Sequence, residues 1–348
     1  QTTHTVDGFD PDATDTPANP TTETPTASTT ATSGGSGPGF TAVSVAAAVA
    51  LLSLVALRRR DCDSGSLLPA TLHGPAMTVI EATHRNHGAT FREVGGRRVV
   101  DEYGRPERTH RAVRNVVGVC EFGYGVIVVT GDDRVDYVDN AVSNRVPSTD
   151  GEGCYALLLD PQGRVETELY VYNAGERLLV FTPPQRADPL AEEWQGKTFI
   201  QDVDIRVATD DFATFGVHGP KATEKIASVL HQAASPEAPL TFDRGELGDA
   251  GVTVIRTDNL AGEESYEVVC GADDGGRVFD TLVNRGLNAV PFGYRTWETL
   301  TTEAGSPLFD TEIEGALPND LGLRNALDFE KGCYVGQEVV SRVENQGY

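Results

Sequence analysis

The chain has 348 residues, and 52 acidic against 28 basic side chains give it a formal net charge of −24 at pH 7. This acidity argues against a nucleic-acid binder and against docking on an anionic membrane, because both need a basic face. Strong acidity with few lysines resembles proteins from salt-rich cytoplasms. The five cysteines include no C-x-x-C pair, so we expect reduced, mostly buried thiols and no metal site.

The first 76 residues differ in composition from the rest of the chain. Residues 1–39 are rich in Thr and Pro and almost lack large apolar side chains, which predicts a disordered stalk. An uncharged apolar run at residues 40–57 is just long enough to span a bilayer, and three arginines follow it. We therefore expect a hydrophobic helix with an Arg cluster at 40–60 and a linker at 61–76.

The Thr-rich stretch, Pro38-Gly39-Phe40, the apolar run and the arginines resemble, in this order, the sorting tail of archaeal surface proteins. In that family the tail ends the protein, whereas here a long globular sequence follows. Our hypothesis is that residues 1–60 belong to an upstream surface protein and that Met77 is the native start. A plain single-pass anchor is the alternative. Both interpretations predict that the downstream residues are cytoplasmic, because arginines flanking a span stay inside.

Residues 77–348 alternate strand and helix patterns, which predicts an α+β fold with two subdomains, roughly 77–210 and 211–348. No G-x-G-x-x-G or G-x-x-x-x-G-K-[ST] sequence points to a dinucleotide, ATP or GTP. A hairpin turn is expected at 160–163, and helices are expected after Asp133, at 222–233, at 277–285 and after Cys333. Apolar runs predict strands at 125–130, 155–159, 169–172, 178–181, 215–218, 252–255 and 266–269.

The most specific local pattern is K-G-C-Y-V-G-Q-E at residues 331–338. Cys333 lies two residues from Lys331 and just before a predicted helix that starts near Gln337. A cation and a helix N-terminus both favour the thiolate, so Cys333 and Lys331 are candidate reactive residues. Gly332 and Gly336 allow a ligand to approach the backbone closely. The alternative is a structural cysteine in a glycine-bounded turn.

This octapeptide resembles the signature of the folate-binding YgfZ-type proteins, relatives of the glycine-cleavage T-protein, an aminomethyltransferase. Residues 218–222 are similar to the superfamily's Q-G-P-x-A, residues 262–267 to its G-E-x-x-Y-E and residues 303–307 to its E-x-G-x-P. The resemblance covers residues 79–348. It implies a T-protein-like folate-binding fold with ferredoxin-like subdomains in a cloverleaf around tetrahydrofolate. The superfamily continues into a C-terminal β-barrel lobe, which we expect to be missing here.

The resemblance also implies site residues. Glu263 takes the position of the carboxylate that grips the donor edge of the pterin, and Tyr155 is expected to supply wall surface. With them we group Gly332, Gly336 and Gln337 as cofactor-binding residues. Glu168, or less favourably Glu166, is the carboxylate nearest to the T-protein's catalytic Asp. A solvated loop acid at Glu263 and a core aromatic at Tyr155 are the alternatives.

The leading functional prediction is a tetrahydrofolate-binding accessory factor for iron–sulfur cluster assembly or repair and the tRNA modification that depends on it. Cys333 would be its reactive group, held as thiolate by Lys331. The alternatives are a tetrahydrofolate-dependent aminomethyltransferase with Glu168 as acid or base, and a surface anchor based on residues 1–60. Thr301 and Thr302 stand where the T-protein has an Arg, which weakens the transferase interpretation. The expected partners are folate and iron–sulfur assembly proteins, with no nucleic acid and with a membrane only through residues 40–57.

Overall fold

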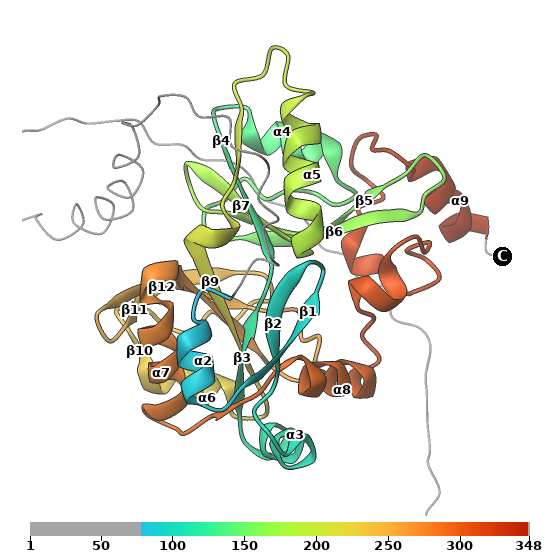
Figure 1. Cartoon of the computed structure of the whole chain (residues 1–348). Coiled ribbons are helices and arrows are strands. Elements are labelled where there is room, and N and C mark those ends of the chain that lie inside the picture. Colours follow the sequence, from blue (N-terminus) through green and yellow to red (C-terminus); the bar gives the residue numbers. More distant parts are fainter. Residues whose placement is uncertain (1–77, 347–348) are drawn as a thin grey trace, which may run out of the picture. The chain divides into compact units, whose positions relative to one another are not determined.

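Two large β-sheets with helices packed on them, together with a small two-stranded sheet, make up most of the part of the chain that the computed structural model describes, residues 78–346 (Figure 1). The predicted stalk, apolar helix and linker, and the proposed start at Met77, lie outside these described residues. Within residues 78–346, no helix has the length and apolar character that crossing a membrane requires.

The five-stranded sheet has the strand order β5–β6–β7–β4–β8, and all its neighbours are antiparallel. Strand β4 (Gly125–Thr130) is buried on both faces, which explains its unbroken apolar sequence. Ile127 and Val129 pack with helices α4 (Arg134–Ala141) and α5 (Pro184–Gln195), whereas Val126 and Val128 contact the second sheet. The other strands are β5 (Gly153–Leu159), β6 (Val165–Asn173), β7 (Arg177–Thr182) and β8 (Asp204–Val207).

The second sheet has seven strands in the order β10–β11–β12–β13–β9–β3–β14. Its last strand runs parallel to β3, and the other neighbours are antiparallel. Helices α6 (Ala222–Val229) and α7 (Gly275–Asn284) bury Ile226 and Phe279 in the core on one face. The strands are β3 (Gly118–Phe122), β9 (Phe212–His218), β10 (Leu230–His231), β11 (Phe242–Leu247), β12 (Ala250–Arg256), β13 (Tyr266–Gly271) and β14 (Val290–Pro291).

Smaller elements surround the two sheets. A separate hairpin of β1 (Thr90–Val94) and β2 (Arg97–Glu102) lies close to helix α8 (Tyr294–Ala304). The other helical elements are α2 (Glu81–Asn86), α3 (Pro106–Asn115), η1 (Thr209–Asp211), η2 (Ala272–Asp274), the π-helical turn η3 (Phe309–Ile313), η4 (Arg324–Ala326) and α9 (Gln337–Gln346).

The predicted α+β character is confirmed, and each predicted strand corresponds to an observed one, namely β4, β5, β6, β7, β9, β12 and β13. The helix predicted at 222–233 ends earlier, at Val229, because Leu230 and His231 pair with β11. The predicted subdomains do not match the two sheets. Strand β3 lies in the first predicted subdomain but pairs with β9 in the second.

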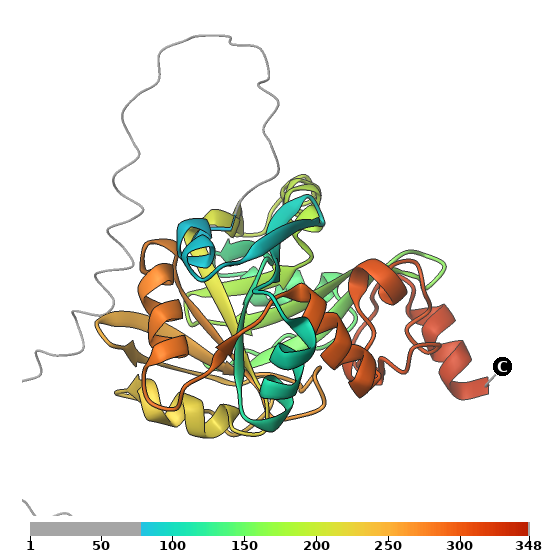
Figure 2. The ribbon, with the colours of Figure 1, turned by 60° about the horizontal axis from the view of Figure 1, so that its bottom comes forward.

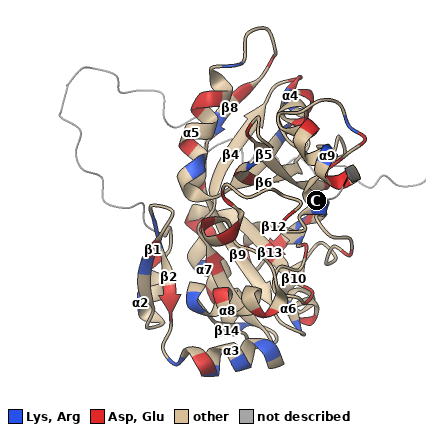
Figure 3. Ribbon diagram, turned by 90° about the vertical axis from the view of Figure 1, so that its right-hand side faces the viewer, with Lys and Arg blue, Asp and Glu red and all other residues tan. Residues whose placement is uncertain are grey.

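The C-terminal segment, residues 331–346, packs against the β5–β6 hairpin (Figure 2). Tyr334 and Val340 are buried in a cluster with Leu157, Leu159 and Val165 of the hairpin. Acidic residues occur in many of the helices, strands and loops, and several arginines lie on α3 (Figure 3).

Candidate functional site

A cavity of about 350 Å³ lies where the two sheets, helix α8 and the β1–β2 hairpin meet. This volume falls in the range of roughly 300–1,000 Å³ that is usual for small-molecule sites. Its walls are mainly aromatic and apolar with a few charged groups, as in such sites. The aromatic, charged and apolar residues of this lining include Arg92, Phe122, Tyr124, Tyr155, Glu168, Tyr170, Asp258, Leu260, Tyr294, Trp297, Glu298, Phe309 and Asp310.

Strands β5 and β6 bring two tyrosines and a carboxylate to one wall of this cavity. Tyr155 pairs with Tyr170 in the antiparallel ladder, and Glu168 is two residues from Tyr170, so all three side chains share a face. The two rings are stacked with their centroids 4.7 Å apart. The Tyr155 hydroxyl donates a 2.8 Å hydrogen bond to Glu168 Oε2. The structure thus places Tyr155 and Glu168, two of the residues predicted from the sequence, side by side at the cavity, and their roles stay predictions.

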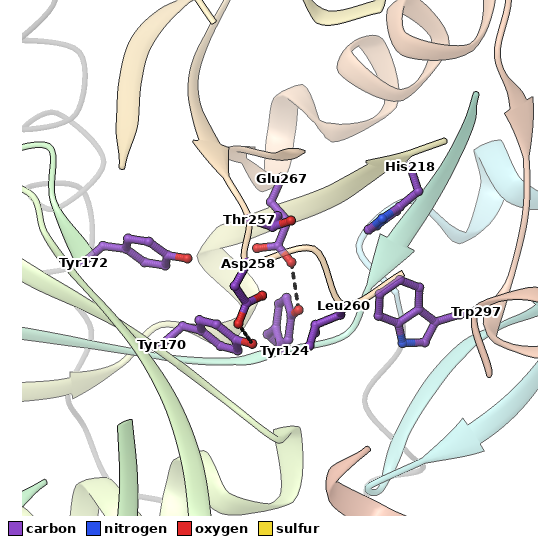
Figure 4. Close-up of a pocket in the computed structure, with 9 residues that line it drawn as sticks. All are labelled: Tyr124, Tyr170, Tyr172, His218, Thr257, Asp258, Leu260, Glu267 and Trp297. Atoms are coloured by element: carbon purple, nitrogen blue, oxygen red, sulfur yellow. Dashed lines mark hydrogen bonds between the residues drawn. The ribbon is translucent and has the colours of Figure 1, made fainter. Parts of the chain in front are cut away.

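Two further carboxylates face this wall, and each also accepts a hydrogen bond from a tyrosine. The Tyr170 hydroxyl donates to Asp258 Oδ2 at 3.1 Å, and the Tyr124 hydroxyl donates to Glu267 Oε1 at 2.8 Å. Asp258 follows β12, and Glu267 lies on β13 in the other sheet. Both pairs line a small space of about 10 Å³ that shares residues with the large cavity and that we call its narrow end (Figure 4). The other residues around the narrow end are Tyr172, His218, Thr257, Leu260 and Trp297. Three Tyr–carboxylate pairs thus meet at the junction of the sheets.

Burial raises the pKa of all three carboxyl groups. It raises the pKa of Glu168 to about 7, with smaller upward contributions from Asp258 and Asp310 and an opposing one from the Tyr155 hydrogen bond. Burial, assisted by Asp258, likewise raises the pKa of Glu267 to about 7, against the Tyr124 hydrogen bond. The pKa of Asp258 is also raised by burial. Carboxyl groups that titrate near 7 can both hold and accept protons at physiological pH.

Arg92 is the only Lys or Arg among the described residues that line the cavity. It forms an ion pair with Glu298 on α8 and lies 3.7 Å from the carboxylate of Asp101. No group of three or more His, Cys, Asp or Glu residues within 78–346 is arranged to hold a metal ion. The groups available to bind a ligand here are therefore aromatic rings, carboxyl groups, an imidazole and a guanidinium.

Glu263, the predicted pterin carboxylate, is not among the residues that line the cavity. Its Oε1 lies 3.6 Å from a guanidinium nitrogen of Arg114, which also donates to the backbone carbonyl of Ala261. The carboxylate that this stretch supplies to the cavity is Glu267, four residues further along on β13. Glu263 lies in the loop before β13, whereas Glu267 lies on the strand and pairs with Gly216 of β9, a pairing that the sequence pattern does not reveal.

Lys331 belongs to the C-terminal segment and does not line the cavity. Its ammonium group is buried and donates to the backbone carbonyls of Asp139, Val142 and Asn144 at 2.5, 3.0 and 2.8 Å, next to the carboxylate of Asp139 at 3.3 Å. These contacts bind the segment to the end of helix α4. They give Lys331 a structural role, and the expected one of holding a thiolate at Cys333 stays a prediction.

The other predicted residues of the octapeptide also lie away from the cavity lining. The Cys333 thiol and Gly332 are exposed. Gly336 has a φ of +79°, and a Cβ there would come within 2.6 Å of the carbonyl oxygen of Asp160, so close packing on the hairpin requires glycine. The backbone N–H of Gln337 donates to the carbonyl of Tyr334 as α9 begins. Their expected part in cofactor binding stays a prediction.

The sequence predictions did not include Asp258, Glu267, Arg92, Tyr170 or His218 as site residues. Tyr170 had a signal, because it shares the period-two face of Glu168. Asp258 and Glu267 reach the site only because the seven-stranded sheet packs against the five-stranded one. His218 was noted as the first residue of a strand-to-helix turn, without a role.

The chain is similar to known proteins in sequence and in fold. The family described as "GCVT N-terminal domain" matches residues 80–331. An aminomethyltransferase of Corynebacterium jeikeium is 27% identical over 295 residues, which cover 78% of this chain and 75% of that protein. One of Paraburkholderia phymatum is 31% identical over 264 residues, covering 72% and 69%. The crystal structure of the glycine cleavage system aminomethyltransferase T from Bartonella henselae superimposes with a TM-score of 0.68 at 18% identity, covering 78% of this chain and 76% of that one.

Proposed function

Because the chain belongs to the GCVT N-terminal domain family, we propose that it is a tetrahydrofolate-dependent aminomethyltransferase. The observation that carries the proposal is the group of carboxyls that line the cavity and its narrow end, two of which, Glu168 and Glu267, have a pKa of about 7. The names of the curated relatives support this function over the accessory role that the octapeptide suggested.

The residues of the cavity fit a reduced pterin. Its N–C–N edge presents hydrogen-bond donors, which a carboxylate accepts, and Asp258 and Glu267 offer such oxygens at the narrow end. Its ring needs flat apolar walls, and Tyr124, Leu260 and Trp297 line the space next to these carboxyls. Arg92, nearer Glu298 and α8, is suited to an anionic part of the ligand.

Glu168 is the residue that we assign to proton transfer. When bound, tetrahydrofolate would supply a nucleophilic ring nitrogen. With a pKa of about 7, Glu168 can give up or take a proton at physiological pH, which is the condition for efficient acid–base catalysis. Its hydrogen bond to Tyr155 fixes the position of the carboxyl group.

The test is an aminomethyl-transfer assay with the purified chain, an aminomethyl-loaded carrier protein and tetrahydrofolate, followed by the formation of methylenetetrahydrofolate. We expect Glu168→Gln to lower the rate by about 10²–10⁴-fold while tetrahydrofolate still binds. Cys333→Ala is the matched control, because this exposed residue lies outside the cavity lining. No methylenetetrahydrofolate from the unmodified protein would exclude the transferase.

A YgfZ-type accessory role in iron–sulfur cluster assembly is the second candidate, and the exposed thiol of Cys333 next to the start of α9 favours it. For this role we propose that the protein is cytoplasmic and that its partners are iron–sulfur assembly proteins. A deletion strain complemented with Cys333→Ala or with Glu168→Gln separates the two functions. The accessory role requires that Cys333→Ala fails to restore iron–sulfur enzyme activity. Normal activity in the uncomplemented deletion strain would exclude it.

A further inference from the structure

His218, the last residue of strand β9, is a buried polar side chain without a role in the proposed chemistry. It is 2% exposed, and neither of its ring nitrogens has a hydrogen-bond partner among the described residues. Buried polar groups are nearly always hydrogen-bonded, because leaving them unpaired destabilises the fold. A buried imidazole whose nitrogens are both unpaired points to a hydrogen-bond partner that comes from outside the chain, such as a ligand.

The surroundings of His218 keep its ring neutral and in place. Trp297, Phe122 and Phe292 surround it with ring centroids at 4.8, 5.7 and 6.0 Å. Burial lowers the pKa of His218 to about 3, so at pH 7 the imidazole offers one N–H donor and one acceptor nitrogen. Gly216 makes room for the ring, since a Cβ there would lie 2.5 Å from His218 Nε2.

His218 reaches the narrow end of the site from the side opposite the carboxyls. A space of about 10 Å³ separates it from Asp258 and Glu267, and Figure 4 shows the imidazole and Trp297 on one side with the two acids on the other. Five residues, among them Leu260 and Trp297, line both this space and the large cavity. The narrow end has room for about one oxygen atom, whereas a ring fits only in the wider part.

We propose that His218 determines ligand specificity by donating a hydrogen bond to a carbonyl oxygen on the edge of the ligand's ring. Asp258 or Glu267 accepts from the N–H groups of the same edge. The site would thus select a heterocycle with a ring carbonyl beside ring N–H donors, the pattern of a lactam. This inference rests on the proposed function, since the pterin of a reduced folate carries this pattern.

The first measurement is the affinity for 5-formyltetrahydrofolate, a stable reduced folate, by calorimetry on the full chain. His218→Leu removes the hydrogen-bond donor and puts an apolar side chain of similar bulk in its place. We therefore expect binding to weaken by about tenfold to a hundredfold. His218→Gln is the matched control, because its amide N–H can still donate without charge, and we expect a loss of less than about fivefold.

The second measurement is thermal unfolding without ligand. Replacing an unpaired buried polar group by an apolar one stabilises a fold, so His218→Leu should melt higher than the unmodified protein, by roughly 2–4 °C. A residue with a purely structural hydrogen bond would show the opposite. Nitrogen-15 spectra of the imidazoles give a third readout: ligand should shift the resonance that is missing in His218→Gln.

The outcomes separate this inference from the proposed function. If the unmodified protein does not bind the reduced folate, the proposed function fails, and the inference fails with it. If it binds and His218→Leu binds equally tightly, or the His218 resonance does not move, only the role of His218 is overturned. Weaker binding by a variant that melts higher supports the inference, because misfolding cannot produce that combination.

Discussion

At the scale of single residues, burial raises the pKa of Glu168, and two of its neighbours act on that pKa in opposite directions. The Tyr155 hydrogen bond stabilises the ionised form, and the nearby Asp258 disfavours it. Tyr155→Phe should therefore raise the pKa of Glu168 above about 7, and Asp258→Asn should lower it. The pH at which methylenetetrahydrofolate formation changes should move upward in the first variant and downward in the second.

The matched control is Tyr172→Phe, because Tyr172 lines the narrow end of the site without a hydrogen bond to Glu168. Its pH profile should stay that of the unmodified protein. A profile that moves in the same direction in the Tyr155 and Asp258 variants would mean that another group controls the pH dependence. The carboxyl of Glu267, with its own pKa of about 7, would then be the candidate.

The sequence could predict the half of the site that one hairpin supplies. Tyr155 and Glu168 lie on adjacent strands joined by a recognisable turn, so local spacing brings them together. Asp258 follows strand β12, and Glu267 and His218 lie on strands β13 and β9; the approach of these strands to the first sheet depends on packing between sheets. Apolar strands carry little information about their partners, and this half of the site required the structure.

At the scale of elements, the segment at 331–336 connects helix α4 to the β5–β6 hairpin. The ammonium of Lys331 caps carbonyls at the C-terminal end of α4, where a cation is favourable. Lys331→Met keeps the aliphatic stem but leaves these carbonyls unpaired in a buried place. We expect a loss of about 2–4 kcal/mol in the free energy of unfolding, measured by urea denaturation.

Cys333→Ala is the control within the same segment, because the cysteine is exposed and two residues away. It should change the free energy of unfolding by less than about 0.5 kcal/mol. Equal stability of the Lys331 variant and the unmodified protein would contradict the structural role of this lysine. The octapeptide predicted a helix start correctly, but the reactive role expected for Lys331 depended on where its ammonium points, which spacing does not reveal.

At the scale of the whole molecule, the alternation of strand and helix patterns was enough to predict an α+β fold. It did not predict how the strands are divided between the two large sheets. The strand β3 joins a sheet whose other strands lie at residues 212–271 and 290–291. The chain thus enters the seven-stranded sheet, builds the five-stranded one, and returns. A composition shift marks the boundary near residue 77, whereas no such shift marks a crossing between sheets.

The excess of acidic residues makes stability depend on salt. Residues 1–76 hold seven acids and three bases, so residues 77–348 carry −20 of the total charge of −24. Acidic residues occur along the whole described ribbon in Figure 3, and the mutual repulsion of so many like charges acts against folding. Raising the concentration of KCl from about 0.1 M to about 1 M shortens the screening length from roughly 10 Å to 3 Å, so the unfolding temperature should rise.

Exposed ion pairs such as Arg295 with Asp101, at 2.9 Å, are weakened by the same screening. Each contributes only about 0–1 kcal/mol, so we expect relief of repulsion to dominate at this net charge. Calorimetric scans in KCl, with sucrose at equal osmolality as the uncharged control, measure the balance. A melting temperature that falls with KCl would show that the ion pairs outweigh the repulsion, and the acidity would then not indicate adaptation to salt.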